Sequence, residues 1–295
     1  MSEDFLAQMA RGSRERLEQA RRHRSQEATR ALALASPLPP RLSLSGAGFD
    51  LIAELKLRSP ASGVLGPAAE ELQQRVCDYA AAGAAAISVL TEPSRFDGTL
   101  AHLAQATGAL ARATEPARQP AGPVPVMRKD FLVDPYQIYE ARALGAGGAL
   151  VILRMLSREA QQALIEACAD AQLFALLEAF DERDLTRAAE LVNHYRARVT
   201  LLVGINCRDL GTLQVVPGRL EALAGALPAG VPHVAESGVQ SGADAARLAR
   251  AGYDVALVGS ALMRAPDAGA LAREILRAGR RAGRTSRGIP AEQEP

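Results

Sequence analysis

The stretch VPVMRKDFLVDPYQIYEARALGAGGALVILRM (Val124–Met155) contains two short apolar runs that flank a segment of helical composition. Val124–Asp130 and Gly148–Met155 have the length and the content of Val, Ile and Leu that are typical of buried strands. Pro135–Leu144 lies between them, and a proline is tolerated in the first turn of a helix. The stretch therefore predicts a strand, a crossover helix and a second strand parallel to the first.

The same pattern recurs along the chain. Eight apolar runs are present, namely Asp50–Leu57, Ala85–Glu92, Val124–Asp130, Gly148–Met155, Phe174–Phe180, Leu201–Asp209, Pro232–Val239 and Val255–Leu262. Segments of helical composition follow them, such as Pro67–Ala82, Arg158–Ala171 and Gly242–Ala251. Eight such units predict an α/β fold, a (β/α)8 TIM barrel over residues 48–281. A doubly wound open sheet is the rival, but no G-x-G-x-x-G motif follows the first strand and no P-loop is present.

Composition restricts the classes of function. The 295 residues include 34 Lys and Arg against 33 Asp and Glu, and 48% of them are hydrophobic. This balance excludes disorder for the bulk of the chain and gives no overall field that attracts nucleic acid or an anionic membrane. No stretch approaches the roughly 20 apolar residues of a membrane-spanning helix. We therefore expect a cytoplasmic protein with no nucleic-acid and no membrane partner.

The cysteines and histidines do not predict a metal site. Cys77, Cys168 and Cys207 are far apart and form no C-x-x-C pair, which disfavours a disulfide framework or a zinc site. We interpret them as small thiols that are buried or half-buried. The four histidines show no spacing typical of metal ligands.

Polar residues gather where the predicted strands end. They are Glu54 and Lys56, Thr91 and Glu92, Lys129 and Asp130, Arg154, Glu178, Asn206 and Arg208, Glu236 and Ser237, and Gly259 and Ser260. In a barrel the carboxyl ends of the strands form one rim, where barrel enzymes carry their active sites. Glu54 and Lys56 are two residues apart and so point to the same side of their strand. Each residue alone could be a rim salt bridge, but their convergence favours an active site.

The last two strand ends carry small residues and hydroxyls. Glu236-Ser237-Gly238 and Gly259-Ser260 precede short helical segments, where exposed backbone N–H groups form a cradle for an anion. Late strand ends are the usual phosphate position in barrels. The sequence therefore predicts a phosphorylated small-molecule substrate.

Seven stretches carry a resemblance in their order along the chain. They are Ile52–Pro60 (IAELKLRSP), Ile87–Leu100 (ISVLTEPSRFDGTL), Pro125–Ala146 (PVMRKDFLVDPYQIYEARALGA), Leu176–Leu185 (LLEAFDERDL), Gly204–Thr212 (GINCRDLGT), Val234–Val239 (VAESGV) and Ala256–Arg264 (ALVGSALMR). They resemble the indole-3-glycerol-phosphate synthases of tryptophan biosynthesis. The resemblance implies a carboxy-lyase that closes the indole ring of 1-(2-carboxyphenylamino)-1-deoxyribulose 5-phosphate and releases carbon dioxide and water. It also implies that no metal or organic cofactor is needed.

The resemblance assigns catalytic roles position by position. The implied set is Lys129, Glu178, Lys56, Glu54 and Asn206. Lys129 is expected to act as the acid at the ribulose carbonyl, because ring closure would otherwise develop an unstabilised alkoxide. Glu178 is the expected base and Lys56 the assisting acid of the dehydration. Glu54 and Asn206 are expected to hold the lysines and the substrate amine.

The resemblance also implies binding residues. Ser59, Ser237, Gly238, Gly259 and Ser260 match phosphate contacts, and Pro60, Phe96, Phe131, Leu150 and Leu210 match the lining of the anthranilate ring. Arg208 matches a position that binds or orients the substrate, with a structural ion pair as its alternative, and Glu236 completes the polar set. The alternative for Phe96 and Phe131 is hydrophobic packing under a loop.

The chain departs from the family pattern in its loops and termini. Ala61 and Ser62 follow Pro60 where the family commonly has serine and lysine, and Ala113–Pro123 is a proline-rich insertion. Residues 1–47 are predicted as a helical extension that covers the rim, and residues 282–295 as a flexible tail. RNA binding by the arginine-rich extension is disfavoured because aromatic residues do not interleave its charges.

Two other functions remain open at this stage. Lys129 could be a Schiff-base nucleophile acting on a phosphorylated sugar, or the barrel could bind phosphate or a partner without catalysis. The silent barrel is disfavoured because the lysines and glutamates are all present. The sequence leaves open whether the enzyme works alone or in association with other enzymes of the tryptophan pathway.

Overall fold

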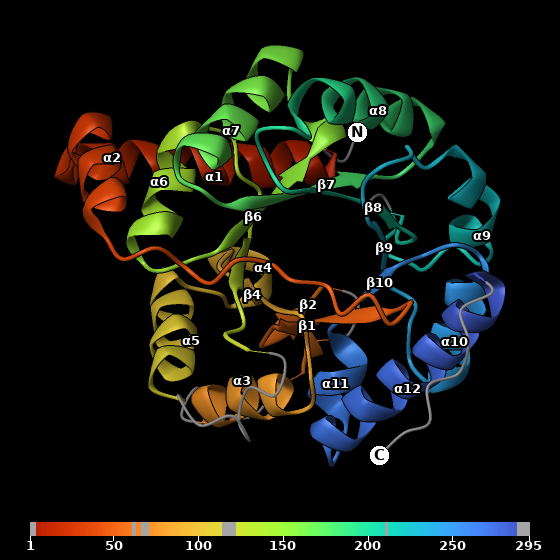
Figure 1. Cartoon of the computed structure of the whole chain (residues 1–295). Coiled ribbons are helices and arrows are strands. Elements are labelled where there is room, and N and C mark those ends of the chain that lie inside the picture. The colour runs from red at the N-terminus through yellow and green to blue at the C-terminus, as the bar shows by residue number, and fades with distance from the viewer. Residues whose placement is uncertain (1–3, 61–62, 66–70, 114–121, 210–211, 288–295) are drawn as a thin grey trace.

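The computed structural model describes residues 4–60, 63–65, 71–113, 122–209 and 212–287. Eight parallel strands form a closed barrel in the order β1-β10-β9-β8-β7-β6-β5-β4 (Figure 1). Their bounds are β1 (Asp50–Leu55), β4 (Ala86–Leu90), β5 (Val126–Lys129), β6 (Gly148–Ile152), β7 (Phe174–Ala179), β8 (Leu201–Asn206), β9 (His233–Glu236) and β10 (Val255–Val258). The barrel closes because β1 pairs with both β4 and β10. The predicted TIM barrel is confirmed and the open sheet is wrong.

Each hydrogen-bonded strand is shorter than the apolar run that predicts it. The run at Leu201–Asp209 yields a strand that ends at Asn206, and Arg208 instead forms an isolated antiparallel bridge with Val215. The run at Asp50–Leu57 ends as a strand at Leu55, and β2 (Arg58–Ser59) and β3 (Gly63–Val64) form a small antiparallel pair beyond it. The last residues of each run therefore lie beyond the strand, above the barrel.

Helices surround the barrel in the alternating order that the sequence predicts (Figure 1). They are α3 (Leu72–Ala81), α4 (Pro93–Phe96), α5 (Leu100–Arg112), α6 (Pro135–Ala143), α7 (Arg158–Asp170), α8 (Glu182–Tyr195), α9 (Arg219–Leu223), α10 (Gly242–Arg250), α11 (Ser260–Arg264) and α12 (Ala268–Arg287), with 3-10 turns at Leu153–Met155 and Ala224–Ala226. Side chains of Asp134, Ser157 and Asp181 accept hydrogen bonds from the first turns of α6, α7 and α8. Pro135 occupies the first turn of α6 as predicted, and Pro67 lies outside the described residues.

Strand alternation divides the hydrophobic residues into two cores. Leu51, Ala53 and Leu55 of β1 pack outward against the helices, whereas Ile52 of the same strand points into the barrel. An apolar layer fills the interior of the barrel below the rim, and it consists of Ile52, Met127, Phe174, Leu202, Val234 and Val255. The barrel is thus a packed core, and the space for a ligand lies above this layer.

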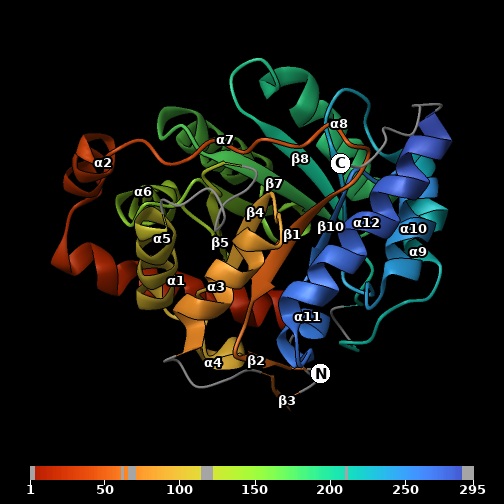
Figure 2. The same ribbon diagram turned by 60° about the horizontal axis from the view of Figure 1, so that its bottom comes forward.

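The N-terminal extension forms two helices, α1 (Phe5–His23) and α2 (Gln26–Ala35). Helix α1 runs across the same end of the barrel as β2, β3, α4 and α11 (Figure 2). Its Leu6 and Met9 are buried in the interior cluster of the barrel. Helix α2 lies at the side of the barrel and packs against α6.

Helix α12 extends beyond the predicted end of the barrel at 281. It continues through Arg287, so residues 282–287 are helical and do not form the predicted flexible tail. Residues 288–295 lie outside the described residues. Gly283 faces the backbone of Gly48 so closely that a Cβ built on it would stand 2.5 Å from the Gly48 carbonyl oxygen. Arg280 of the same helix donates to Asp50 at 2.9 Å, which ties α12 to the first strand.

The structure also describes the features that bear on membrane crossing, the cysteines and the loops. Among the described residues, no helix has both the length and the apolar composition needed to cross a membrane. Cys168 and Cys207 are buried and Cys77 is half-buried, as predicted. Ala61 and Ser62, together with residues 114–121 of the insertion, lie outside the described residues.

Candidate active site

A cavity of about 490 Å³ opens at the rim above the apolar layer. The predicted site residues that line it are Glu54, Lys56, Ser59, Pro60, Phe96, Lys129, Phe131, Leu150, Glu178, Asn206, Arg208, Glu236, Ser237, Gly238, Gly259 and Ser260. Leu210 lies outside the described residues. The structure therefore brings together every predicted site residue that it describes. We call Glu54, Lys56, Lys129, Glu178 and Glu236 the charged layer of the barrel.

Lys129 lies at the centre of the charged layer. It follows Met127 by two residues on β5, so its side chain points into the barrel above the apolar layer. Its Nζ lies 2.9 Å from Oε2 of Glu178 and 2.9 Å from Oε2 of Glu236. Burial lowers the pKa of Lys129, but the carboxylates of Glu178, Glu236 and Glu54 outweigh burial and raise the pKa above its usual value. Lys129 is thus a buried cation at neutral pH.

The surroundings of Glu236 favour its neutral, protonated form. Burial raises the pKa of Glu236 well above its usual value, and the nearby carboxylate of Glu178 adds to the rise while Lys129 opposes it. Within the described residues, Oε1 of Glu236 has no hydrogen-bond partner. Its carboxylate lies against Gly204 of β8, where a Cβ would occupy the same space. A glycine in GINCRD is therefore required for Glu236 to point into the pocket.

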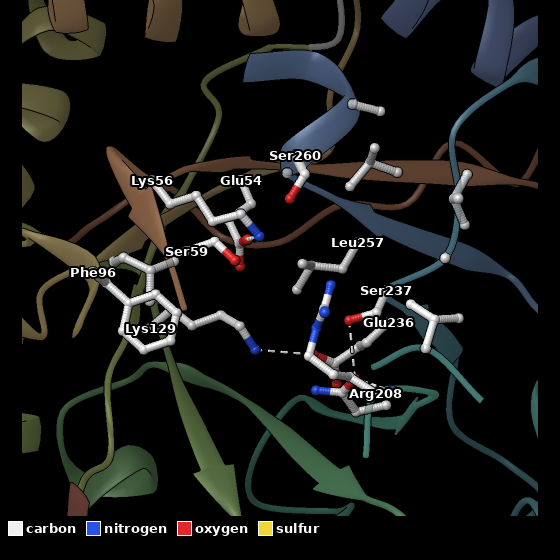
Figure 3. Close-up of a pocket in the computed structure, with 18 of the residues that line it drawn as sticks. Glu54, Lys56, Ser59, Phe96, Lys129, Arg208, Glu236, Ser237, Leu257 and Ser260 are labelled. Carbon is white, nitrogen blue, oxygen red and sulfur yellow. Dashed lines mark hydrogen bonds and ion pairs between the residues drawn. The ribbon is translucent and has the colours of Figure 1, made fainter. Parts of the chain in front are cut away.

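Lys56 and Glu54 form a second ion pair in the charged layer. Nζ of Lys56 lies 2.7 Å from Oε1 of Glu54, and Glu54 is buried on the inward face of β1. Gly259 at the end of β10 leaves the space for this pair, since a Cβ there would collide with the Glu54 carboxylate. Figure 3 shows Lys56 beside Glu54 and Lys129 reaching toward Glu236. The pocket thus holds two lysines, each fixed by carboxylates.

Small residues and hydroxyls gather near Ser237 at one end of the pocket. Ser237 and Gly238 both have left-handed backbone conformations, with φ of +68° and +78°. Oγ of Ser237 donates to Oδ1 of Asn206 at 2.9 Å, and the same oxygen accepts the backbone N–H of Arg208. The guanidinium of Arg208 donates to the carbonyl of Leu213 at 2.6 Å while the side chain still lines the pocket. This end therefore offers backbone N–H groups and hydroxyls to an anion.

The opposite end of the pocket is aromatic, with Lys129 between the two ends in Figure 3. The ring centroids of Phe96 and Phe131 are 6.1 Å apart, and Phe5 of α1 meets Phe131 edge-to-face at 5.9 Å. We call Phe5, Phe96 and Phe131 the aromatic wall. All three line the cavity, and Phe131 also belongs to the interior hydrophobic cluster, against which Phe5 and Phe96 pack. The wall can hold a planar aromatic group.

Three strand-end residues do not line this pocket. Arg154 donates to Asp181 at 2.6 Å and to Asp184 at 2.8 Å, and its guanidinium lies over the ring of Phe180. Glu92 accepts backbone N–H groups at the start of α4, and Thr91 donates to Asp130. Arg154, Thr91 and Glu92 therefore make structural contacts at the rim and are not part of the pocket.

Some residues that line the pocket were not predicted from the sequence. Ile152 and Leu257 line it, and strand alternation could have identified them because each lies two residues from a predicted site residue. Asp130 lines the pocket and was noted only as a strand end. Phe5 lies far from the barrel strands in sequence, and no local signal indicates its position.

Within the ranges that the structure describes, no group of three or more His, Cys, Asp or Glu side chains is arranged to hold a metal ion. The charged layer combines carboxylates with lysines, and lysine ammonium groups are donors that do not ligate metals. The arrangement is suited to moving protons and stabilising charge.

Comparisons with known proteins identify the family of the chain. A family model described as indole-3-glycerol phosphate synthase matches residues 6–275. The chain is 42% identical to the indole-3-glycerol phosphate synthase of Opitutus terrae over 76% of this chain and 79% of that protein. It is 38% identical to that of Micrococcus luteus over 96% of this chain and 99% of that protein. A tryptophan synthase structure from M. tuberculosis, with a TM-score of 0.54 and 18% identity, covers 82% of this chain and 100% of its own and supports the fold alone.

Proposed function

The chain belongs to the indole-3-glycerol phosphate synthase family, and from this premise we propose how its pocket carries out the reaction. It is a carbon–carbon lyase of tryptophan biosynthesis, which converts 1-(2-carboxyphenylamino)-1-deoxyribulose 5-phosphate to indole-3-glycerol phosphate, carbon dioxide and water. The observation that supports the mechanism best is the position of Lys129, a buried cation between an anion-binding end and an aromatic end.

The substrate is proposed to span the pocket from end to end. Its phosphate lies against the small residues and hydroxyls, namely Ser59, Ser237, Gly238, Gly259 and Ser260. Its anthranilate ring lies against Pro60, Phe96, Phe131 and Leu150, and the unplaced Leu210 remains a prediction. Arg208 is proposed to orient the substrate from the rim. This pose puts the ribulose carbonyl near Lys129.

Ring closure is proposed to depend on the Lys129 ammonium. The anthranilate ring carbon that bears the carboxylate attacks the ribulose carbonyl carbon, and the carbonyl oxygen takes a proton from Lys129 as its charge develops. Glu178 and Glu236 keep Lys129 charged before the step, because each lies 2.9 Å from its Nζ. Loss of carbon dioxide then returns an electron pair to the ring.

Dehydration is proposed to use the second lysine. The remaining hydroxyl leaves as water when Lys56 protonates it, and Glu178 removes the proton whose bonding electrons form the indole double bond. Glu54 holds Lys56 at 2.7 Å, and Asn206 is proposed to hold the substrate amine. One such acid or base typically contributes ~10²–10⁴-fold in rate.

The electrostatics of Lys129 disfavour the Schiff-base alternative. A Schiff-base lysine must attack as the neutral amine, and such lysines have a lowered pKa. Carboxylates raise the pKa of Lys129 instead, despite its burial. Borohydride trapping with a phosphorylated ketose should therefore give no covalent adduct.

We also propose a division of labour along the chain. Residues 48–281 would form the catalytic barrel, and residues 1–47 would enclose the substrate. The support is that α1 lies over the rim and contributes Phe5 to the pocket.

The proposal is tested by indole fluorescence on mixing the protein with 1-(2-carboxyphenylamino)-1-deoxyribulose 5-phosphate. The chain has no tryptophan, so its own emission is weak. The wild type should give a rising signal, which Lys129→Ala should lower by ~10²–10⁴-fold and Glu178→Gln by a similar factor. Circular dichroism checks that each variant is folded. A folded wild type that binds the substrate without turning it over would contradict the proposal.

A further inference from the structure

Arg16 of α1 reaches the active-site rim without lining the pocket. Its NH2 lies 2.8 Å from Oδ1 of Asp130, and its NH1 lies 3.6 Å from Oε1 of Glu92. The Arg16 side chain is 28% exposed, whereas the carboxylates of Asp130 and Glu92 are 0% and 1% exposed. One cation on the extension therefore bridges two buried carboxylates that follow different strands of the barrel.

The first of these carboxylates fixes Phe131. Oδ1 of Asp130, the atom that accepts from Arg16, also accepts the backbone N–H of Phe131 at 2.8 Å. Oδ2 of Asp130 accepts from Thr91 at 2.7 Å and from Arg128 at 3.2 Å. Asp130 thus keeps partners on its other oxygen when Arg16 is removed, but the oxygen that holds Phe131 loses its charged partner.

The second carboxylate fixes Phe96. Glu92 caps α4, because its Oε1 accepts the backbone N–H of Ser94 at 2.8 Å and its Oε2 accepts that of Arg95 at 2.7 Å. Helix α4 is a single turn that ends at Phe96. The orientation of this turn, and with it the Phe96 ring, depends on where Glu92 lies.

The third ring is on the same helix as Arg16. Phe5 packs edge-to-face on Phe131, and the Arg95 guanidinium of α4 donates to Gln8 of α1 at 3.1 Å. The three rings of the aromatic wall therefore come from α1, α4 and the segment after β5, which are far apart in sequence. Arg16 lies on the first of these elements and contacts the carboxylates that hold the other two.

We infer that Arg16 is a positioning residue that assembles the aromatic wall and so sets the affinity for the aromatic ring of the substrate. The inference rests on the proposed function, because it takes the wall as the place of the anthranilate ring. Arg16 touches neither the phosphate end nor Lys129. Its loss should therefore weaken binding of the aromatic group and leave anion binding unchanged.

The same helix offers a matched control. Arg21 of α1 pairs with Asp134 at 2.8 Å, also just after β5, but its side chain is 40% exposed. Neither Arg21 nor Asp134 lines the pocket. Arg21→Gln removes an ion pair between the same two segments without touching a carboxylate that holds the wall.

The experiment compares the full-length wild type with Arg16→Gln, Arg16→Lys and Arg21→Gln. Steady-state kinetics give KM and kcat, and titrations with anthranilate and with inorganic phosphate probe the two ends of the pocket separately. Arg16→Gln should raise KM and the anthranilate dissociation constant about tenfold, with kcat and phosphate binding within about threefold of the wild type. Arg16→Lys should restore part of the loss, and Arg21→Gln should match the wild type.

Two results would overturn the role of Arg16. One is equal behaviour of Arg16→Gln and Arg21→Gln, and the other is equal weakening of anthranilate and phosphate binding in Arg16→Gln, which indicates general loosening. A wild type that binds both probes without turnover would contradict the proposed function alone, because the titrations would still decide what Arg16 does.

Discussion

The lower and upper halves of the barrel interior are built by the same strands and contain opposite chemistry. On β1, β5, β7 and β9 the apolar layer contributes Ile52, Met127, Phe174 and Val234. Up to four residues further along the same strands, the charged layer contributes Glu54, Lys129, Glu178 and Glu236. Both layers point inward and both are largely buried, so burial alone does not distinguish them.

The difference between the two layers shows that one strand can contribute to both stability and catalysis. Each large apolar side chain that is buried stabilises the fold by roughly 1.5–3 kcal/mol. Buried charges carry a desolvation cost that their partners only partly offset, and that cost shifts their pKa values. The apolar layer should therefore determine unfolding, and the charged layer should determine turnover and its dependence on pH.

The strongest test of this division is Phe174→Ala in the apolar layer. Phe174 is 3% exposed and fits over Gly148, where a Cβ would collide with its ring. Its truncation should lower the free energy of unfolding by about 3–5 kcal/mol, as measured by urea denaturation. The kcat/KM of the folded fraction at 25 °C should stay within a few-fold of the wild type. A loss of activity in fully folded protein would break the separation of the two layers.

Gly204→Ala should show the reverse pattern. The added Cβ displaces the Glu236 carboxyl group and with it one of the two groups that hold the Lys129 ammonium. We expect kcat/KM to fall about 100-fold, because small misplacements of catalytic groups have effects of that order. Gly225→Ala is the matched control, since a Cβ at Gly225 meets no atom within 4 Å. Equal activity of the two variants would show that the position of Glu236 is not important.

Glu236→Gln should change how stability depends on pH. The pKa of Glu236 is raised in the folded state, so above the ordinary value the folded chain holds a proton that the unfolded chain releases. Raising the pH through this range therefore favours unfolding of the wild type, and the variant lacks this loss. The Tm difference, variant minus wild type, should grow as the pH rises from 4.5 upward. A difference that falls with pH would contradict the assignment.

Ser88→Ala should have the smallest effect. Ser88 is buried on β4 beside Glu54 of β1, and its hydroxyl has no hydrogen-bond partner in the described part of the structure. An unpartnered buried hydroxyl is unfavourable, so its removal should stabilise the fold by up to about 1 kcal/mol in chemical denaturation. Turnover should not change, because Ser88 does not line the pocket. A clear loss of activity would extend the charged layer by one residue.

Sequence was sufficient for the elements whose signal is local. Apolar runs such as Gly148–Met155 identified the strands, and two-residue spacing placed Glu54 and Lys56 on one face. The resemblance identified the pocket residues on the strands because strand order fixes where they meet. The strands were predicted to extend further than they do, since composition does not show where the hydrogen bonds between strands stop.

Contacts between distant segments were beyond sequence reasoning. Phe5 lines the pocket because α1 lies across the rim. Arg154 does not line it, because its guanidinium pairs with Asp181 and Asp184. The end of α12 was predicted too early, because sequence does not show that Gly283, which has no side chain, lets the helix pack on Gly48.

The closure of β1 onto β10 has a consequence for synthesis of the chain. Asp50 pairs with Val255, so one edge of the first strand has no partner until β10 has been made. At ordinary rates of translation, about 200 intervening residues correspond to roughly 10–40 s during which that edge is open to other chains. Helix α12, which follows β10 in the chain, then covers β1 through the bond from Arg280 to Asp50. A ribosome that stalls before codon 255 would therefore release an open sheet, and such nascent chains are the ones that would need a chaperone.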